Sequence, residues 1–338
     1  MSQHPSSRPA GALTADTEIL VALRAAGSGG VSGAELAQRL RVTRAAVWAR
    51  IQELRQLGYD IAANPHDGYR LVSAPDLLLA DDIASRLGPV RVVGRDLRVF
   101  RETTSTSDIV ERLAQANVPE GVVVFAEAQT RGRGRLGRHW HSPAGKGLWF
   151  SVLLRPRLRP AEATRLTIAT ATALARGIQA QAGLTVAIKW PNDLLLRGRK
   201  VAGILTELSA ELDRIKYLIV GVGVDVNVGA QEFSPDLRRH ATSLAAEAGR
   251  PLDRAELAVA VLRALDHDYQ RVTDGRFDEI ADEWAARCTT LGQPVAITVG
   301  ERRIRGRAEA LDTDGALLVR TEHGHLERVI GGDIRLEK

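Results

Sequence analysis

The chain has 338 residues, of which 44% are apolar and 26% charged, and this ordinary composition excludes a globally disordered protein. Its 46 basic residues against 41 acidic ones give a formal charge of +5, which permits a phosphate-bearing partner without requiring one. Cys288 is the only cysteine, so disulfides within the chain and cysteine-rich zinc sites are excluded.

The first residues favour a cytoplasmic protein. Residues 1–12 are rich in Ser, Pro and Gly and lack the continuous apolar core of a secretion signal. No later apolar run approaches the length that a bilayer requires. We therefore expect a cytoplasmic chain whose residues 1–15 are disordered.

Residues 16–74 are predicted to form a winged helix-turn-helix domain. Apolar residues at helical spacing predict three short helices, the third capped by Thr43 and ended by Gly58. Two alternating segments, 59–62 and 69–72, flank an Asn-Pro-His-Asp-Gly turn and predict a hairpin wing. The residues that set the helical spacing are Ile19, Leu20, Leu23, Leu36, Leu40, Val47, Ile51 and Leu54.

The third helix is the candidate DNA-binding element. Thr43, Arg44, Trp48 and Arg50 are predicted to lie away from its apolar stripe, which suits phosphate contacts and base-edge readout in a major groove. Alternatively, the winged helix is a dimerisation or regulatory module and its arginines form a solvated face. Acidic residues in the same segment offset much of the arginine charge, so charge does not decide between the two.

A larger domain is predicted over residues 76–290, where apolar strands alternate with amphipathic helices. The helix predicted from Ser107 follows a run of hydroxyls that includes Ser105 and Thr106. Such a run either caps the helix or holds a polar ligand, and capping is the commoner role. Beyond residue 290, short strands with tight turns predict a small β-barrel over residues 291–338.

The most distinctive stretch is a glycine- and arginine-rich loop between two predicted strands, residues 121–125 and 147–154. The loop reads Gln129-Thr130-Arg131-Gly132-Arg133-Gly134-Arg135-Leu136-Gly137-Arg138-His139-Trp140. Glycine lets the backbone approach a ligand, and arginine offers donors that match carboxylate and phosphate oxygens. The loop is therefore a candidate anion site.

Three further motifs follow in order. Lys189-Trp190-Pro191-Asn192-Asp193 closes a predicted strand, Lys200 follows a basic hairpin turn, and Gly221 and Gly223 interrupt a strand that ends at Asn227. Strand glycines often mark the close approach of a ligand or another backbone. Residues 229–242 show little periodicity and predict a mobile loop, placed to act as a lid.

The chemistry that these motifs suit is adenylyl transfer. The Gly-x-x-x-x-Gly-Lys-Ser/Thr loop, the Gly-x-Ser-x-Gly elbow and the His-Glu-x-x-His helix are absent from the sequence. What remains is charge neutralisation by arginine and lysine, which suits a reaction that develops charge on phosphates.

Residues 129–140 resemble the Gly-Arg-Gly-Arg-x-Gly-Arg-x-Trp signature of biotin-protein ligases. The segments around Lys189, Lys200 and Gly221–Asn227 match the later motifs of that family in order. The winged helix and the terminal barrel are similar to the bifunctional class, which includes the biotin operon repressor. The resemblance implies an α+β fold with a winged helix-turn-helix, a central ligase domain like class II aminoacyl-tRNA synthetases, and a C-terminal SH3-like β-barrel.

The resemblance also implies a two-step reaction. Biotin and ATP, with Mg²⁺, give biotinyl-5′-AMP and pyrophosphate, and biotin then passes to a lysine of a biotin carboxyl carrier protein, an acetyl-CoA carboxylase subunit. It further implies binding to operator DNA and a homodimer in the ligand-bound state, formed through edge strands of the central sheet.

Site residues follow from the resemblance position by position. Lys200 and Arg135 are implied to be catalytic, and Asp193 to be a magnesium ligand. The implied biotin contacts are Ser105, Thr106, Ser107, Gln129, Arg133, Gly134, Arg135 and Lys200. The implied ATP contacts are Arg138, Trp140, Lys189, Asn192 and Asn227. Ser107 departs from the family pattern, which has asparagine there, and a serine reaches less far than an amide.

Two other functions remain open. One is a lipoate-type protein ligase, for which the hydroxyls at residues 105–107 would have no evident use. The other is a repressor whose large domain senses a small molecule without ligase activity.

Overall fold

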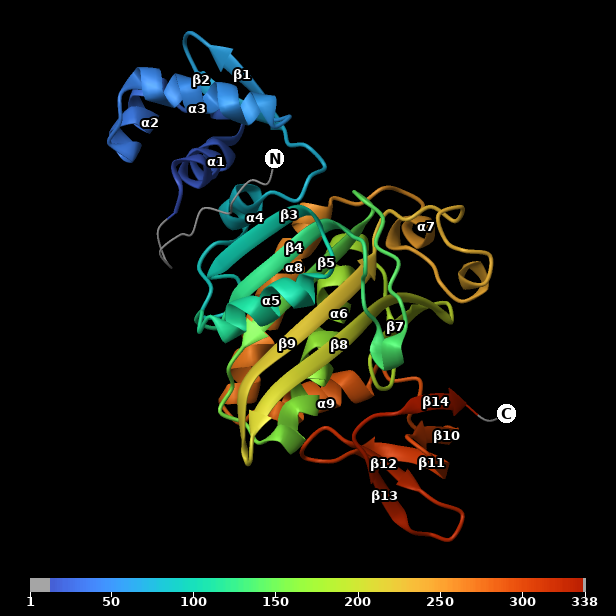
Figure 1. Ribbon diagram of the computed structural model, residues 1–338. Coiled ribbons are helices and arrows are strands. Elements are labelled where there is room, and N and C mark those ends of the chain that lie inside the picture. Colours follow the sequence, from blue (N-terminus) through green and yellow to red (C-terminus); the bar gives the residue numbers. More distant parts are fainter. Residues whose placement is uncertain (1–12, 337–338) are drawn as a thin grey trace. The chain divides into compact units, whose positions relative to one another are not determined.

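The computed structural model describes residues 13–336, and the chain divides into two compact units, Met1–Pro89 and Val90–Lys338 (Figure 1). Of the segment predicted to be disordered, residues 1–12 lie outside the described part. Thr14 and Ala15 already belong to the start of the first helix, where the Thr14 side chain accepts a hydrogen bond from the Thr17 N–H.

The first unit contains the predicted winged helix-turn-helix. Its helices α1 (Ala15–Ala26), α2 (Gly33–Leu40) and α3 (Arg44–Gln56) each begin after a hydroxyl side chain that accepts a backbone hydrogen bond. Strands β1 (Asp60–Asn64) and β2 (Gly68–Ser73) pair antiparallel as the wing. The apolar positions named from the sequence are buried together, apart from the partly buried Leu40.

Helix α4 (Ala80–Leu87) also packs within this unit, against α1. The Asp81 carboxylate accepts hydrogen bonds from the hydroxyls of Thr14 and Thr17, the latter at 2.7 Å. The Asp82 side chain, 1% exposed, forms ion pairs with Arg24 and with Arg86, the latter at 2.8 Å. Two neighbouring aspartates thus fix α4 to α1.

The second unit is built on a seven-stranded mixed sheet in which β3 and β4 are parallel and the remaining neighbours are antiparallel. In spatial order the strands are β3 (Asp96–Thr103), β4 (Val122–Gln129), β5 (Gly147–Leu154), β9 (Arg214–Asp225), β8 (Arg199–Glu211), β7 (Asp193–Leu196) and β6 (Ala187–Lys189). The predicted basic hairpin is the turn between β7 and β8.

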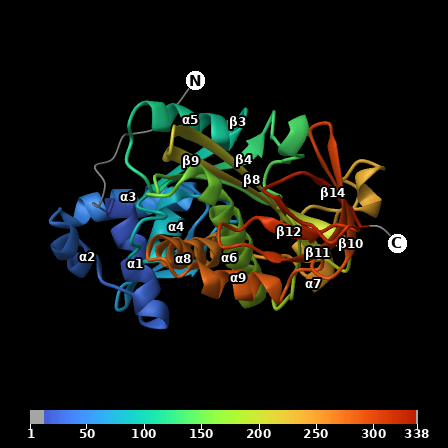
Figure 2. The same ribbon diagram turned by 90° about the horizontal axis from the view of Figure 1, so that it is seen from below.

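Helices cover both faces of this sheet. Helix α5 (Thr106–Gln115) packs through Val110 and Ala114 on one face. Helices α6 (Thr164–Ala182), α8 (Arg254–Thr273) and α9 (Phe277–Ala285) lie together on the other face, as Figures 1 and 2 show. The short helix α7 (Leu244–Ala248) follows the loop after β9.

The C-terminal segment forms a five-stranded antiparallel sheet in the order β13-β12-β11-β10-β14. Its strands are β10 (Pro294–Val299), β11 (Arg302–Leu311), β12 (Leu317–Arg320), β13 (Leu326–Val329) and β14 (Asp333–Leu336). The predicted α+β fold class is confirmed. Within residues 13–336, no helix is long and apolar enough to cross a membrane.

Arg254 provides a test of how the second unit is held together. This arginine on α8 is fully buried, and its guanidinium pairs with Glu127 of β4 at 2.6 Å. Arg254→Met leaves the Glu127 carboxylate without its buried counter-charge and should destabilise the unit by about 3–5 kcal/mol. Urea unfolding measures the loss. The double variant Glu127→Gln/Arg254→Met should recover part of the lost unfolding free energy, because it removes the unpaired carboxylate. Equal losses in the single and the double variant would contradict this account.

Candidate active site

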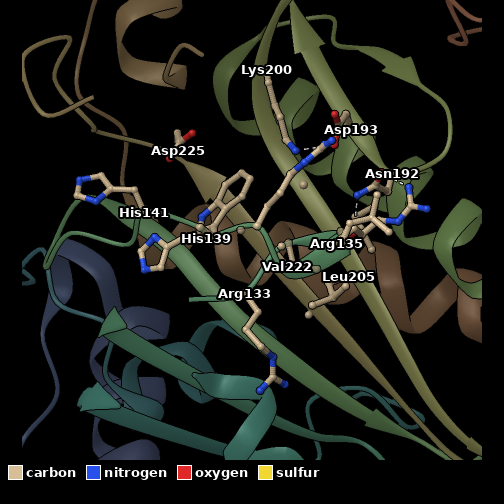
Figure 3. Close-up of a pocket in the computed structure, with 18 of the residues that line it drawn as sticks. Arg133, Arg135, His139, His141, Asn192, Asp193, Lys200, Leu205, Val222 and Asp225 are labelled. Atoms are coloured by element: carbon tan, nitrogen blue, oxygen red, sulfur yellow. Dashed lines mark hydrogen bonds and ion pairs between the residues drawn. The ribbon is translucent and has the colours of Figure 1, made fainter. Parts of the chain in front are cut away.

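A cavity of about 340 Å³ opens on the sheet of the second unit (Figure 3). Its walls come from the start of α5, the glycine-arginine loop, the β6–β7 turn, strands β8 and β9, and residues 332–334 of the C-terminal sheet. The structure therefore brings together nearly all the ligand contacts predicted from the sequence. Those that line the cavity are Ser105, Thr106, Ser107, Gln129, Arg133, Gly134, Arg135, Arg138, Trp140, Lys189, Asn192, Asp193 and Lys200.

Buried hydroxyls form one end of the cavity. The Gln129 Oε1 atom accepts hydrogen bonds from the Thr106 N–H (2.8 Å) and from the Thr106 hydroxyl (3.2 Å). The Ser151 hydroxyl lies 2.7 Å from that of Thr106 and 3.1 Å from that of Ser107. Ser105 precedes α5, yet its side chain makes no capping bond and lines the cavity. The hydroxyl run thus serves the cavity more than it caps the helix.

The glycine-arginine loop folds back on itself. The Gly134 N–H donates to the Arg138 carbonyl (2.7 Å), and the Trp140 N–H donates to the Gly132 carbonyl (2.9 Å). The Arg133 guanidinium turns away from Lys200 and Arg135, as Figure 3 shows, and pairs with Asp108 and with Glu207 at 3.0 Å. Of the three loop arginines that line the cavity, Arg133 therefore bridges two carboxylates, whereas Arg135 contacts Asn192 and Arg138 contacts Asp333.

The Trp140 indole lies against two strand glycines. A Cβ atom added at Gly223 would stand 2.5 Å from the ring, and one added at Gly203 would stand 2.9 Å from it. The Lys200 Nζ atom lies 5.1 Å from the ring centroid, within cation–π range. The close approach predicted for the glycines of β9 is therefore made within the chain, by the indole at Gly223 and by the Ser107 hydroxyl at Gly221.

Charged and amide groups converge at the other end of the cavity. The Lys200 Nζ atom pairs with the Asp193 Oδ1 atom at 2.6 Å. Asn192 accepts a hydrogen bond from Arg135 Nη1 (3.1 Å) and donates one to the Ile204 carbonyl (2.8 Å). A lysine and an arginine are thus held ready for an anion by partners that a ligand can displace or share.

Sequence reasoning missed Asp333, which comes from the C-terminal sheet. Its carboxylate accepts a hydrogen bond from Arg138 Nη2 at 2.9 Å, and it lines the cavity with Gly332 and Ile334. No local signal marks this residue, because its role depends on how a separately predicted domain packs.

Asp225 is a second residue that sequence reasoning did not select, although it stands in the quoted β9 motif. It lines the cavity and is 6% exposed. Burial raises the pKa of its carboxyl group well above the usual range, and the nearby Lys200 charge offsets this only in part. The signal available in the sequence was an acidic residue within an otherwise apolar strand.

Asn227, which was predicted to contact ATP, does not line the cavity. Its side-chain amide donates to the Leu252 carbonyl (2.9 Å) and accepts from the Leu252 N–H (3.0 Å). It therefore ties the residues just after β9 to the segment that leads into α8.

The segment predicted as a lid, residues 229–242, borders the cavity through Phe233, Leu237 and Ala241. Phe233 packs with Trp149 and Val228 in a small apolar cluster that Trp140 and Ala241 join. The segment thus lies beside the tryptophan at the end of the glycine-arginine loop.

No group of three or more His, Cys, Asp or Glu side chains suited to a metal ion occurs within residues 13–336. Asp193, the predicted magnesium ligand, is a single carboxylate already paired with Lys200. These residues do not form a magnesium site by themselves. Magnesium is commonly bound by one or two carboxylates together with substrate phosphates, so a single carboxylate suits only a metal that arrives with its nucleotide.

The candidate DNA-binding residues lie on the exposed surface of α3. Arg44 and Trp48, four residues apart, lie on one side, and Trp48 is 58% exposed. The Thr43 hydroxyl caps the helix by accepting a hydrogen bond from the Ala46 N–H at 3.2 Å. Arg50 lies on the other side of the buried stripe, where it pairs with Glu53 at 2.9 Å. The four residues therefore lie at the start of α3 or on its surface, with Arg44 and Trp48 on one side of the buried stripe.

Three stretches of the chain match known families. Residues 99–225 match the biotin/lipoate A/B protein ligase family, residues 17–70 an HTH domain, and residues 290–336 the biotin protein ligase C terminal domain. The chain is 37% identical over 311 residues to the bifunctional ligase/repressor BirA of Bacillus spizizenii, covering 92% of this chain and 95% of that protein. It is 31% identical over 306 residues to BirA of Escherichia coli, covering 90% and 92%.

A similar solved structure is the biotin protein ligase from Aquifex aeolicus in complex with biotin and ATP. It superposes with a TM-score of 0.62 at 31% identity and covers 72% of this chain and 99% of that one.

Asp225→Asn tests the buried carboxyl group. A raised pKa in the folded state means that the folded chain holds the proton more tightly, so this group's contribution to stability is present below about pH 4 and is lost as the pH rises toward the folded pKa. The variant should therefore melt higher than the unaltered chain at pH 8, by about 2–4 °C for each 1 kcal/mol regained. Differential scanning calorimetry between pH 5 and 8 measures the difference, which should grow with pH; a pH-independent difference would contradict the assignment.

Proposed function

Because the chain belongs to the family of bifunctional biotin ligases and repressors, we propose that the cavity in its second unit is where biotin is joined to ATP and then to an acceptor lysine. The protein is an ATP-dependent biotin-protein ligase with a DNA-binding unit. The observation that best supports this site is that a buried hydroxyl–amide cluster and a lysine–aspartate pair occupy the two ends of one cavity.

The hydroxyl end suits the polar head of biotin. A ureido ring offers two N–H donors and a carbonyl acceptor, which Ser105, Thr106 and Gln129 can match. Ser107, where the family pattern has asparagine, contacts Ser151 and acts through it on Thr106. We therefore assign Ser107 a supporting role, while the Gly134 backbone lines the biotin pocket beside Arg133.

The charged end suits the first chemical step. A biotin carboxylate oxygen bonds to the α-phosphorus of ATP, and the bond from that phosphorus to pyrophosphate breaks. Negative charges crowd together in this step, so Lys200 neutralises the carboxylate and the α-phosphate, while Arg135, Arg138 and Lys189 hold phosphate oxygens. Cations fixed on the protein, partly withdrawn from water, are more effective than mobile ones in solution.

The nucleotide base fits beside Trp140, whose indole already lies against Gly203 and Gly223, with the Asn192 amide as a polar contact. Asn227 acts on this subsite indirectly, by fixing the end of β9 to Leu252. Mg²⁺ is expected to enter as part of the ATP complex, with Asp193 as its protein ligand.

In the second step the acceptor lysine attacks the acyl carbon of the adenylate. The amide bond forms, the bond to AMP breaks and the amine loses a proton. A carrier domain of a biotin-dependent carboxylase is the expected acceptor, and the reaction is expected in the cytoplasm.

The edge of the central sheet is the proposed dimer surface. Strand β7 pairs with β8 only as far as Gly203, while β9 continues along β8 to Glu211. Among the described strands, the outer half of β8 is therefore an open edge beside the cavity. We propose that a second copy pairs here in the ligand-bound state, which light scattering with and without biotin and ATP would detect.

The function is tested by incubating the purified chain with labelled biotin, ATP and a carrier domain. Covalent label on the carrier is expected. Lipoate transfer without biotin transfer would instead make it a lipoate ligase, and ligand-dependent DNA binding without any turnover would make it a sensor only.

Lys200→Ala should lower biotin-dependent pyrophosphate exchange by about 100- to 1000-fold, because one charge-neutralising donor is removed from the reacting phosphate. Lys216→Ala serves as the control, since this exposed lysine of β9 pairs with Glu211 and does not line the cavity. Exchange at the unaltered rate in Lys200→Ala would rule out the assigned role.

Arg44→Ala should weaken operator binding and reduce the salt dependence by about one counterion, because Arg44 lies on the exposed side of α3 with Trp48. Fluorescence anisotropy across a salt series measures the slope, and ligase activity should not change. Arg50→Ala should have a smaller effect, since its guanidinium pairs with Glu53. An unchanged slope for Arg44→Ala would argue for a non-DNA role of the winged helix.

A further inference from the structure

The backbone of Lys200 is held by a segment that lies far from it in the sequence. The Lys200 N–H donates to the His240 carbonyl (2.7 Å), and the Lys200 carbonyl accepts from the Thr242 N–H (2.9 Å). These two bonds form a parallel bridge between the start of β8 and the end of the 229–242 segment. The position of the Lys200 side chain therefore depends on where that segment lies.

One carboxylate joins the two segments from behind. Glu247 of α7 has a side chain that is only 3% exposed, and its Oε1 atom accepts hydrogen bonds from the Thr242 hydroxyl (2.8 Å) and from Arg199 Nη2. Arg197, in the β7–β8 turn, pairs with the same carboxylate at 3.4 Å. The Glu247 carboxylate thus contacts donors on both segments of the bridge that holds Lys200, the β7–β8 hairpin and the end of residues 229–242.

Helix α7, which carries this carboxylate, is held in place by hydrogen bonds of its own. The Ser243 hydroxyl accepts the Ala246 N–H (3.2 Å), and the Ala245 N–H donates to the Val226 carbonyl just beyond β9 (2.8 Å). Charge-assisted hydrogen bonds to a buried carboxylate are among the stronger ones in proteins. Removing the carboxylate would leave a guanidinium and a hydroxyl without their buried partner.

The anchored segment also reaches the tryptophan of the cavity. Phe233 and Ala241, from the same segment, pack in the cluster that contains Trp149 and Trp140. A shift of this segment would therefore affect two places in the cavity, the lysine and the expected nucleotide subsite.

We propose that Glu247 is a positioning residue that couples the placement of Lys200 to the packing of residues 229–242 over the nucleotide subsite. It touches no reactant and acts through Arg199, Thr242 and the backbone of Lys200. This inference rests on the proposed ligase function, and it predicts two linked defects when Glu247 is changed: slower adenylation and faster loss of the adenylate.

The test compares Glu247→Gln, Glu247→Ala and Thr242→Val in the full chain. Biotin-dependent pyrophosphate exchange gives kcat and KM, and release of radiolabelled biotinyl-adenylate gives its dissociation rate. Both Glu247 variants should lower kcat, the alanine variant by about 10- to 100-fold, with little change in the KM for biotin, because the lysine is displaced while the hydroxyl end is untouched. Glu247→Gln keeps a hydrogen-bond acceptor, so its kcat should fall less than that of Glu247→Ala.

Thr242→Val removes one donor to the same carboxylate and keeps the side-chain shape. Its kcat should fall less than that of Glu247→Ala. The kcat of the double variant should fall no further than that of Glu247→Ala alone, because both changes break the same link between Thr242 and Glu247. Adenylate release should be faster in each of these variants than in the unaltered chain.

Asp268→Asn is the matched control. Asp268 is also a fully buried carboxylate, paired with Arg176 and with Arg271 at 3.2 Å, but it does not line the cavity. This variant should alter the Tm but leave kcat and the rate of adenylate release unchanged. Folded Glu247 variants with unaltered kcat and release, or an equal kcat loss in Asp268→Asn, would overturn the inference. Absence of exchange in the unaltered chain would overturn the ligase function first, and this inference with it.

Discussion

The indole of Trp140 lies on a part of the sheet where neither Gly203 nor Gly223 can carry a side chain without meeting the ring. This contact fixes the end of the glycine-arginine loop, which then folds back through the bond between Trp140 and Gly132. Arg138 is thereby brought to Asp333, and Arg135 to Asn192. The packing of one large ring against two glycines thus positions the arginines of the cavity.

The cavity combines groups that are fixed with groups that can change partners. The amide of Gln129 and the backbone of Lys200 are each held by more than one hydrogen bond from distant segments. The side chains of Lys200, Arg135 and Arg138 have one carboxylate or amide partner each near the cavity, which an anionic ligand can share or replace. Charge is therefore preorganised without being neutralised permanently, as electrostatic catalysis requires.

Much of this arrangement follows from local sequence signals. Capped helices, the wing and the ordered motifs, with the family resemblance that the motifs carry, predicted the fold class, and all but one of the expected ligand contacts line the cavity. Strands β3 and β14 and helix α7 were not predicted, because each is short or lacks clear periodicity. Sequence reasoning also did not predict Asp333, Asp225 and Glu247, because their roles depend on packing between segments far apart in the chain. Asn227 was predicted to contact ATP, yet its side chain bonds to Leu252 and does not line the cavity.

The hydroxyls of Ser107, Ser151 and Thr106 form a row that ends at the Gln129 amide. A hydroxyl rotor can present either its hydrogen or its lone pairs, whereas the Gln129 amide is oriented by bonds at both of its ends. A ligand that swaps a donor for an acceptor can therefore be accommodated along the row by reversing the rotors. Discrimination among ring analogues would then fall to the amide, which makes Gln129 the natural position at which to alter ligand selectivity.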